Sequence, residues 1–275
     1  SPPSTQGYLT LSTLKGFEMI NNQDDYLHTL IESYRICASD RDNITFDYLG
    51  KDKKFLGTDD EYIRDKMSLF DKQAAGKYNF PNPHGGGTAY MNAVDQNGLG
   101  ISLIQSNFYG IGSRIGVGNF GFFLHNRGCG FNLIKGHPNS LGPNKKPLHT
   151  LSPTIWSKDG LLDFITGTRG GRYQPQLLAQ TILPYILKES SFEEIMKKPR
   201  WTIEYFGSDT SSNIKFEFIE ESEVSSLEEK GHKISIENKL IGGYGPISTI
   251  YKNSDGNFVG VPDVRVGTEK AFNNS

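Results

Sequence analysis

The sequence predicts an α+β fold in which helices come first and antiparallel strands follow. Near the start, residues 9–20 and 26–38 repeat apolar side chains at the spacing of an amphipathic helix. From residue 88 onward, short strand-like runs are separated by turns that end in glycine. Helices and strands grouped in separate blocks favour α+β layers over alternating βαβ units.

The helical block covers most of the first 87 residues. Asp24 and Asp25 stand just before the second helix, where an N-cap residue is preferred. Residues 61–70 form a third, shorter candidate helix. The stretch 73–87 is rich in asparagine, proline and glycine, which predicts an exposed loop.

Three hairpins are expected in the strand block. Their paired strands are 88–94 with 99–106, 154–157 with 161–166, and 247–252 with 257–261. The remaining expected elements are helices at 175–187, 191–198 and 223–230, and strands at 214–219 and 233–236.

Composition excludes several classes of protein. The 275 residues carry 29 basic and 31 acidic side chains, a balance that argues against a nucleic-acid-binding surface. No run approaches the roughly 18 apolar residues of a membrane span. Two cysteines, Cys37 and Cys129, are too few for a disulfide framework, and a single bridge between them is neither excluded nor implied. Composition leaves the cellular compartment open.

Three glycines, Gly85 to Gly87, run directly into Thr88 at the start of the first hairpin. An N-terminal threonine carries both a hydroxyl nucleophile and, in its own α-amino group, a base. Glycines before it would let the Thr88 hydroxyl reach the Gly87 carbonyl, because they allow strained dihedrals and carry no Cβ. The alternative is a glycine loop that simply enters a strand.

Three further segments carry candidate site residues. The glycine-rich stretch after Gln105-Ser106-Asn107 indicates either a wide loop lining a cavity or a series of bulged hairpins. His149, Thr150 and Ser152 lie in a proline-punctuated polar loop and are candidates to contact a polar ligand, although such groups are more often ordinary loop polar groups. Gly170 and Gly171 precede a helix, where paired backbone N–H groups suit an anion or oxyanion, with loop flexibility as the alternative.

Other catalytic patterns are missing from the sequence. The six histidines form no i,i+4 metal-binding motif with a carboxylate. No G-x-S-x-G nucleophile elbow occurs. We therefore expect neither a metal nor a cofactor.

Taken together, the segments resemble the γ-glutamyltranspeptidase family of N-terminal nucleophile hydrolases. The resemblance rests on several ordered motifs, which are Ser1-Pro2-Pro3-Ser4, Ala38-Ser39-Asp40-Arg41, Leu141-Gly142-Pro143-Asn144-Lys145-Lys146-Pro147, Ser152-Pro153-Thr154 and Gly170-Gly171. It implies a four-layer αββα sandwich. Residues 1–87 would be the end of the large-subunit region, mainly helical, and residues 88–275 the catalytic small-subunit region of the same fold.

The resemblance also implies a mechanism. Thr88 would attack Gly87, cut the chain there and become a new N-terminus. Its hydroxyl would then attack a γ-glutamyl or related amide, Gly170 and Gly171 would donate to the oxyanion, and Asn107 would contact the substrate. Water or an amine acceptor would resolve the acyl-enzyme.

This chain departs from the best-known members of the family at several substrate-binding positions. Arg127 stands where they have a glutamine, and Gly130 where an aspartate holds the substrate's α-ammonium; their serine pair is His149-Thr150 here. A cation in place of an amide favours a bound carboxylate over an ammonium. Small-molecule amides are therefore the expected substrates. The resemblance supports the acyl-enzyme reaction more directly than it supports glutathione as the substrate.

The family's substrate-binding arginine lies upstream of this sequence, so we expect an upstream large-subunit segment to be needed. Arg127, Arg169 or Arg172 are candidates to replace that arginine. Two alternatives stay open: a non-catalytic or incomplete homologue that acts as a binding protein, and a cephalosporin-acylase-like amidase.

Overall fold

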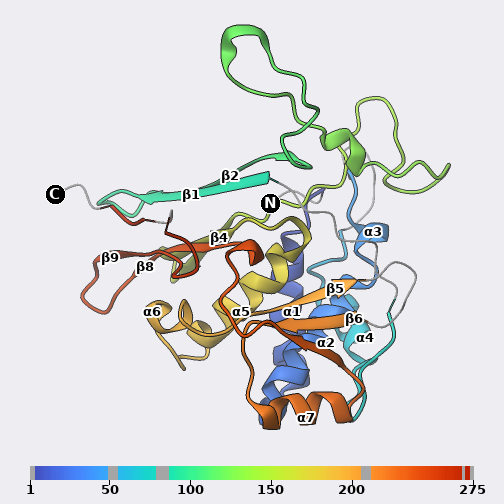
Figure 1. Ribbon diagram of the computed structural model, residues 1–275, viewed down its shortest axis with the longest axis vertical. Helices are drawn as coiled ribbons and strands as arrows, with labels where there is room; N and C mark the ends of the chain where they lie inside the picture. Colours follow the sequence, from blue (N-terminus) through green and yellow to red (C-terminus); the bar gives the residue numbers. More distant parts are fainter. Residues whose placement is uncertain (1–3, 49–54, 79–86, 206–211, 268–269, 273–275) are drawn as a thin grey trace.

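Helices, a four-stranded sheet and a β-hairpin lie in successive layers (Figure 1). The computed structural model describes residues 4–48, 55–78, 87–205, 212–267 and 270–272. The central sheet is antiparallel with the order β3-β4-β8-β9. Its strands are β3 (Thr154–Lys158), β4 (Leu161–Thr168), β8 (Ile247–Lys252) and β9 (Phe258–Val261).

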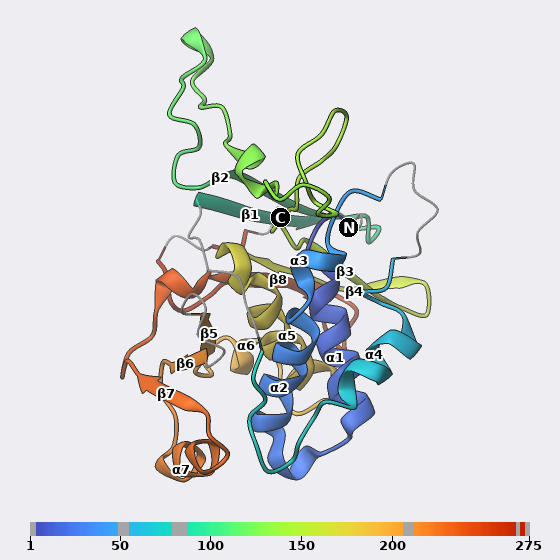
Figure 2. The same cartoon turned by 90° about the vertical axis from the view of Figure 1, so that its right-hand side faces the viewer.

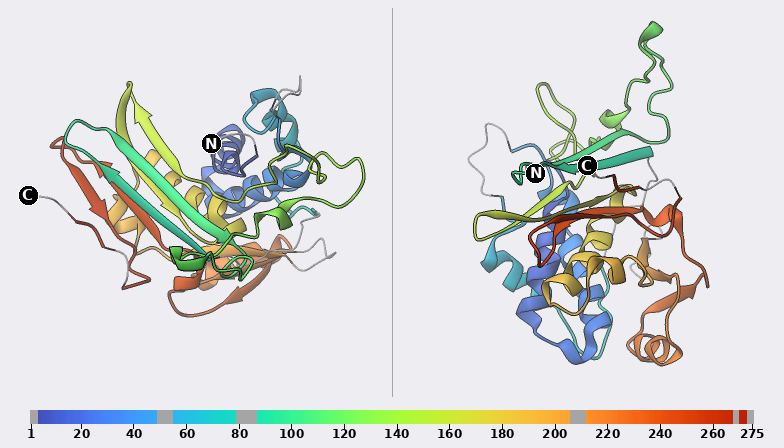
Figure 3. Two further views of the ribbon diagram at one scale, coloured as in Figure 1. Left: turned by 90° about the horizontal axis from the view of Figure 1, so that it is seen from above. Right: turned by 90° about the vertical axis from the view of Figure 1, so that its left-hand side faces the viewer.

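The hairpin of β1 (Gly87–Val94) and β2 (Gly100–Phe108) crosses one face of this sheet, as the view from above shows (Figure 3). The two layers approach closely at Gly167 of β4, where an added Cβ would lie 2.1 Å from the ring of Tyr90. A glycine is required there because the hairpin packs through that aromatic ring.

Helices α1 (Tyr8–Ile20), α2 (Tyr26–Ala38) and α5 (Gln174–Ile186) lie on the opposite side of the central sheet from the hairpin (Figure 2). A mixed sheet of β5 (Trp201–Tyr205), β6 (Ser212–Phe216) and β7 (Lys233–Ile236) flanks them, and α7 (Glu221–Glu229) connects its parallel pair. The shorter elements are α3 (Arg41–Ile44), α4 (Asp60–Met67), α6 (Phe192–Ile195), η1 (Gln23–Asp25), η2 (Gly118–Phe120), η3 (Arg127–Gly130), η4 (Gly171–Tyr173) and η5 (Gly242–Tyr244).

Two clusters of buried side chains form the core. One joins α1, α2 and α4 to β5 and β6, with Leu9, Ile31 and Ile203 fully enclosed. The other packs α5 and α6 against β4 and β8, and its centre is the ring of Phe164, which stacks on Trp156 and contacts Phe192. The helix layer therefore buries the face of the central sheet that lies opposite the hairpin.

The α+β prediction is confirmed, and the described residues supply one helix layer and two sheet layers of the expected sandwich. The outer face of the hairpin carries large apolar side chains at least 46% exposed, namely Met91, Leu99, Ile101 and Leu103. Within the described part of the chain, no second helix layer covers this face.

Some local expectations need correction. Asp25 occupies the N-cap position of α2, but its side chain makes no capping bond; it pairs with Lys230 at 3.1 Å instead. The expected helix at 191–198 is helical only in α6, and β5 was not expected from the sequence. Gly85 and Gly86 lie outside the described residues. No described helix is long and apolar enough to cross a membrane.

A buried charge network ties the end of the chain to the second core cluster. Arg200 donates to Asp263 Oδ2 at 2.6 Å, and Arg265 donates to Glu217 and Asp263. Burial raises the pKa of Asp263, but the charge of Arg200 and N–H donors from Arg265 and Ile247 outweigh it, so the pKa lies below its ordinary value. Burial lowers the pKa of Arg200 to about 10 even beside this carboxylate, so Arg200 stays charged at pH 7.

Asp263→Asn should lower the free energy of unfolding by about 3–5 kcal/mol at pH 7, because it leaves Arg200 buried without its charged partner. The wild-type contribution is present above the ordinary aspartate pKa of about 3.9 and is lost as the pH falls through the lower folded value. Urea unfolding at pH 7 and pH 3 should therefore show a smaller difference between variant and wild type in acid. Asp255→Asn, in an exposed turn, is the control; equal destabilisation by both variants would contradict this role.

Candidate active site

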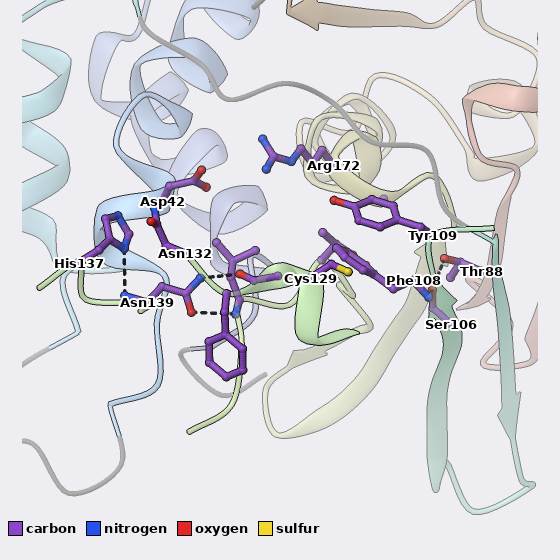
Figure 4. Close-up of a pocket in the computed structure, with 15 residues that line it drawn as sticks. Asp42, Thr88, Ser106, Phe108, Tyr109, Cys129, Asn132, His137, Asn139 and Arg172 are labelled. Atoms are coloured by element: carbon purple, nitrogen blue, oxygen red, sulfur yellow. Dashed lines mark hydrogen bonds between the residues drawn. The ribbon is translucent and has the colours of Figure 1, made fainter. Parts of the chain in front are cut away.

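A cavity of about 160 Å³ lies at the end of the hairpin where β1 begins and β2 ends. Figure 4 shows Thr88 and Ser106 at one end of it, Asp42, His137 and Asn139 towards the other, and Arg172 and Tyr109 between them. Its lining residues come from α3, β1, β2, η3, η4 and the loops near residues 109, 131–139 and 148–150. Segments far apart in the sequence therefore line one small cavity.

Thr88 stands at the start of β1, opposite Ser106 of β2. The Thr88 hydroxyl donates to Ser106 Oγ at 3.0 Å, and Ser106 donates to the Gly87 carbonyl oxygen at 2.9 Å. The N–H of Phe108 donates to the same Ser106 oxygen at 3.0 Å. The Ser106 hydroxyl thus accepts two hydrogen bonds and donates one, which uses its full capacity. This arrangement orients the Thr88 hydroxyl and polarises the carbonyl immediately before it.

The backbone at the Gly87–Thr88 junction is irregular. The register of the β1–β2 pairing shifts between these two residues. A Cβ at Gly87 would lie 2.6 Å from the carbonyl oxygen of Gly110, so no larger residue fits without movement. Across the hairpin, Phe108 has φ 78°, a left-handed conformation that is unfavourable for an aromatic residue. Strain of this kind is concentrated at functional sites.

The Phe108 ring lies against two neighbours that shape the cavity wall. Its centroid is 3.9 Å from that of Tyr109, and the Arg127 guanidinium carbon is 4.1 Å from it. Arg127 is 5% exposed and donates to Thr150 Oγ1 at 3.2 Å. Its Nη2 has no hydrogen-bond partner among the described groups. Burial lowers the pKa of Arg127 to about 10, so the group is still a cation at pH 7.

Thr150 lines the cavity and carries a hydroxyl hydrogen that its bond with Arg127 does not use. Arginine has no acceptor, so the Thr150 oxygen must accept from Arg127 and its own hydrogen remains available to a ligand. The adjacent His149 does not line the cavity. Burial, with the charges of Arg127 and His125, lowers its pKa to about 4, so it is neutral at pH 7.

The turn between β4 and α5 contains Gly170 and Gly171, with φ 114° and 57°. These positive values favour glycine. The Gly170 carbonyl accepts from Tyr173 N–H at 3.0 Å, and the Gly171 carbonyl accepts from the Gln174 N–H and from Gln6 Nε2. Both carbonyls are therefore held, and Gly171 lines the cavity.

The charges around the cavity are mostly positive. Asp42 is paired with Arg41, whose Nε donates to Asp42 Oδ1 at 2.8 Å. Burial raises the pKa of Asp42, but Arg41 and Arg172 outweigh that effect and hold it below the ordinary value. Of the arginines named from the sequence, only Arg172 is among the residues that line the cavity. Arg127 contacts two lining residues, Phe108 and Thr150, without lining the cavity itself. Arg169 is outside the lining.

The structure places three residues of the predicted site at the cavity, namely Thr88, Thr150 and Gly171, and Gly87 borders it through Ser106. Gly170 is adjacent in the same turn. Asn107 does not line the cavity; its carbonyl accepts from Asn126 N–H at 3.1 Å at the base of the loop that protrudes in Figures 1 and 2. The roles of all these residues stay predictions.

Sequence reasoning did not assign roles to Ser106, Asp42, Phe108 and Gln6. Only Ser106 had a usable signal, because the turn at Asn97-Gly98 sets the hairpin register and brings the end of the second strand opposite Thr88. Among the described residues, no cluster of three histidine, cysteine or carboxylate side chains could hold a metal ion.

Comparisons with known proteins agree on one family. The family model described as Gamma-glutamyltranspeptidase matches residues 1–272. The chain is 28% identical over 261 residues to the glutathione hydrolase-like YwrD proenzyme of Bacillus subtilis, covering 90% of this chain and 47% of that protein. It is 28% identical over 275 residues to the oxamate amidohydrolase proenzyme of Klebsiella pneumoniae, covering 96% and 51%. The chain thus spans about half the length of these relatives.

Among solved structures, the chain is similar to a cephalosporin acylase from Bacillus halodurans, with a TM-score of 0.82 at 24% identity. That match covers all of this chain and 51% of the other. A mutant of Helicobacter pylori gamma-glutamyltranspeptidase matches with a TM-score of 0.55 at 22% identity, over 64% of this chain and 99% of that one. These likenesses show that the fold is shared.

Proposed function

The chain belongs to the gamma-glutamyltranspeptidase family, and we propose that it is part of an N-terminal nucleophile amidohydrolase or acyltransferase. In this proposal the chain cuts itself between Gly87 and Thr88 and then acts through a Thr88 acyl-enzyme. One observation carries the proposal: the Thr88 hydroxyl, Ser106 and the Gly87 carbonyl form a continuous hydrogen-bonded chain beside the cavity. Several relatives are named proenzymes, which supports a maturation step.

The proposed self-cleavage uses that geometry. The Thr88 oxygen attacks the Gly87 carbonyl carbon, the Thr88 hydroxyl proton leaves towards Ser106, and negative charge grows on the Gly87 oxygen. Ser106 already donates to that oxygen at 2.9 Å, so it stabilises the charge as it develops. Collapse breaks the Gly87–Thr88 amide bond and leaves the Gly87 acyl group as an ester on the Thr88 oxygen. The proton released from the Thr88 hydroxyl ends on the Thr88 nitrogen, which leaves as the α-amine. Water hydrolyses the ester to a Gly87 carboxylate and a free Thr88 hydroxyl, with an α-amine now beside it.

Turnover then uses the new terminus. The Thr88 α-amine takes the hydroxyl proton as the oxygen attacks the substrate amide carbonyl. The N–H groups of Gly170 and Gly171 are proposed to receive the oxyanion, and the leaving amine takes the proton back from the Thr88 ammonium. Water or another amine attacks the resulting ester and releases the acyl group. Acylation of Thr88 and deacylation each break one bond to the carbonyl carbon and form another.

The acyl donor is proposed to be an amide that carries a carboxylate. Arg127 and Arg172 give the cavity a positive surrounding, and Asp42, an acid at its wall, is already paired with Arg41. A donor carboxylate would accept the Thr150 hydroxyl, which Arg127 polarises from behind. A γ-glutamyl donor has this carboxylate and an additional ammonium, for which the described cavity offers no unpaired acid.

Arg127→Gln should change donor preference. Its loss is expected to lower kcat/KM for glutaryl p-nitroanilide about tenfold relative to γ-glutamyl p-nitroanilide, because the ammonium-free donor depends more on the cation. The measurement is the ratio of kcat/KM on the two anilides with the full-length protein. Arg169→Gln removes an exposed arginine outside the cavity and is the matched control. An unchanged ratio in Arg127→Gln would show that Arg127 does not select the donor.

An upstream segment of the protein is proposed as the partner of this chain. The relatives are about twice as long as the match, and the outer face of the hairpin exposes Met91, Ile101 and Leu103. An apolar sheet face of this kind is normally buried against another layer. Functional assays therefore belong on the full-length protein.

A further inference from the structure

A fully buried glutamine joins three walls of the cavity. Gln6, in the segment just before α1, is 0% exposed. Its Nε2 donates to the carbonyl oxygen of Thr150 at 2.9 Å and to that of Gly171 at 2.8 Å. Its Oε1 accepts from Arg41 Nη1 at 2.7 Å. Both amide hydrogens are used, and the acceptor is engaged by a charged donor.

Each group that Gln6 contacts belongs to a different part of the candidate site. Thr150 and Gly171 line the cavity, and Arg41 holds Asp42, which also lines it. The backbone reinforces the connection, because Gln6 N–H donates to the His149 carbonyl at 2.9 Å and His149 N–H donates to Ser4 at 2.7 Å. The segment before α1 thus runs beside the cavity wall that contains Thr150 and is hydrogen-bonded to it.

Gln6 also fixes a peptide plane next to the one that carries the Gly171 N–H, a proposed oxyanion donor. The Gly171 carbonyl oxygen accepts hydrogen bonds from Gln6 Nε2 and from the Gln174 N–H. These two bonds fix the orientation of the peptide group that joins Gly171 to Arg172. Gly170 and Gly171 have left-handed backbones, which glycine can leave readily, so external bonds are needed to keep one conformation. A donor or acceptor that is buried away from water costs free energy when its hydrogen-bond partner is lost.

We propose that Gln6 is a positioning residue that sets the distance and orientation between the Thr150 wall and the Gly170-Gly171 turn. It does not touch the reacting atoms. The inference rests on the proposed function, because the turn matters for catalysis only if its N–H groups receive the oxyanion. Gln6 has no direct bond to the Thr88–Ser106–Gly87 chain, so self-cleavage should proceed without it while turnover slows.

The test compares Gln6→Met with Gln180→Met in the full-length protein. Gln180 is a close match in bonding: its Nε2 donates to the carbonyls of Gln176 and Trp201, and its Oε1 accepts from Trp201 N–H. It joins α5 to β5 and lies outside the cavity lining. Hydrogen exchange followed by mass spectrometry reports the loops directly, and kcat per cleaved chain reports catalysis.

Gln6→Met should accelerate amide exchange in both segments 149–152 and 171–174, and lower kcat per cleaved chain about 10²-fold through misplacement of the oxyanion donors. Gln180→Met should accelerate exchange near residues 201–203 and leave kcat per cleaved chain unchanged. A general loss of stability would reduce the amount of folded protein but not the rate per cleaved chain.

Wild-type exchange in both loops of Gln6→Met would overturn the inference whether or not the enzyme is active. Faster exchange with unchanged kcat per cleaved chain would overturn it as well. If the wild type itself neither cleaves nor turns over, the proposed function fails separately, and the exchange measurement still decides whether Gln6 couples the two walls.

Discussion

Thr88→Ala should leave the chain uncut at residue 87 and reduce amide hydrolysis by several orders of magnitude. The variant removes the only oxygen that the proposal uses as nucleophile in both reactions, so neither the ester intermediate nor the acyl-enzyme can form. The side chain is only partly buried, and its loss should change the unfolding midpoint little. Intact mass and anilide hydrolysis measure the two effects on one preparation.

Thr88→Ser is the conservative comparison for that variant. It keeps the hydroxyl opposite Ser106 and should still cut itself, more slowly because serine lacks the methyl group that restricts the rotamer. Turnover by Thr88→Ala at a wild-type rate would remove Thr88 from the mechanism. Loss of both functions in Thr88→Ser as well would indicate a structural requirement at this position rather than a nucleophile.

Ser106→Ala should slow self-cleavage about 10²-fold, a typical effect of removing one oxyanion donor. The variant deletes the donor to the Gly87 carbonyl and the acceptor that orients the Thr88 hydroxyl. It also leaves the Phe108 N–H without its partner, which should relax the strained end of β2. The half-time of conversion from one chain to two, followed by mass after synthesis in vitro, measures the effect.

The same strand supplies the control for this experiment. Ser102 lies on the same face of β2, and its hydroxyl is 2.9 Å from Tyr90 Oη, away from Gly87. Ser102→Ala should mature at the wild-type rate, and Ser106→Thr, which restores a hydroxyl, should mature much faster than Ser106→Ala. Equal maturation of Ser106→Ala and wild type would show that Ser106 does not assist cleavage.

Local patterns predicted the elements that are set by local chemistry. Helical spacing of apolar residues identified α1 and α2, and the Asn97-Gly98 turn identified the hairpin that begins at Thr88. β5 was missed because its sequence, Trp201 to Tyr205, is short and is stabilised by pairing with β6 and by packing on α5. Its strand character comes from tertiary contacts.

The cavity could be predicted only in part for a related reason. Thr88, Thr150 and Gly171 were suggested by motifs, but the group that holds two of them, Gln6, is 144 and 165 residues away from its partners. Asp42 likewise reaches the cavity because the short helix α3, which follows α2, lies beside it, and no local pattern specifies that placement. Contacts over such separations are determined by the packing of whole layers.

The most direct measurement is the intact mass of the purified full-length protein under denaturing conditions. Self-cleavage predicts two species whose masses correspond to a break between Gly87 and Thr88, with threonine at the start of the second by terminal sequencing. A single uncut species that persists through prolonged incubation of the folded full-length protein would contradict the proposal and would favour a binding protein that does not use Thr88 as a nucleophile.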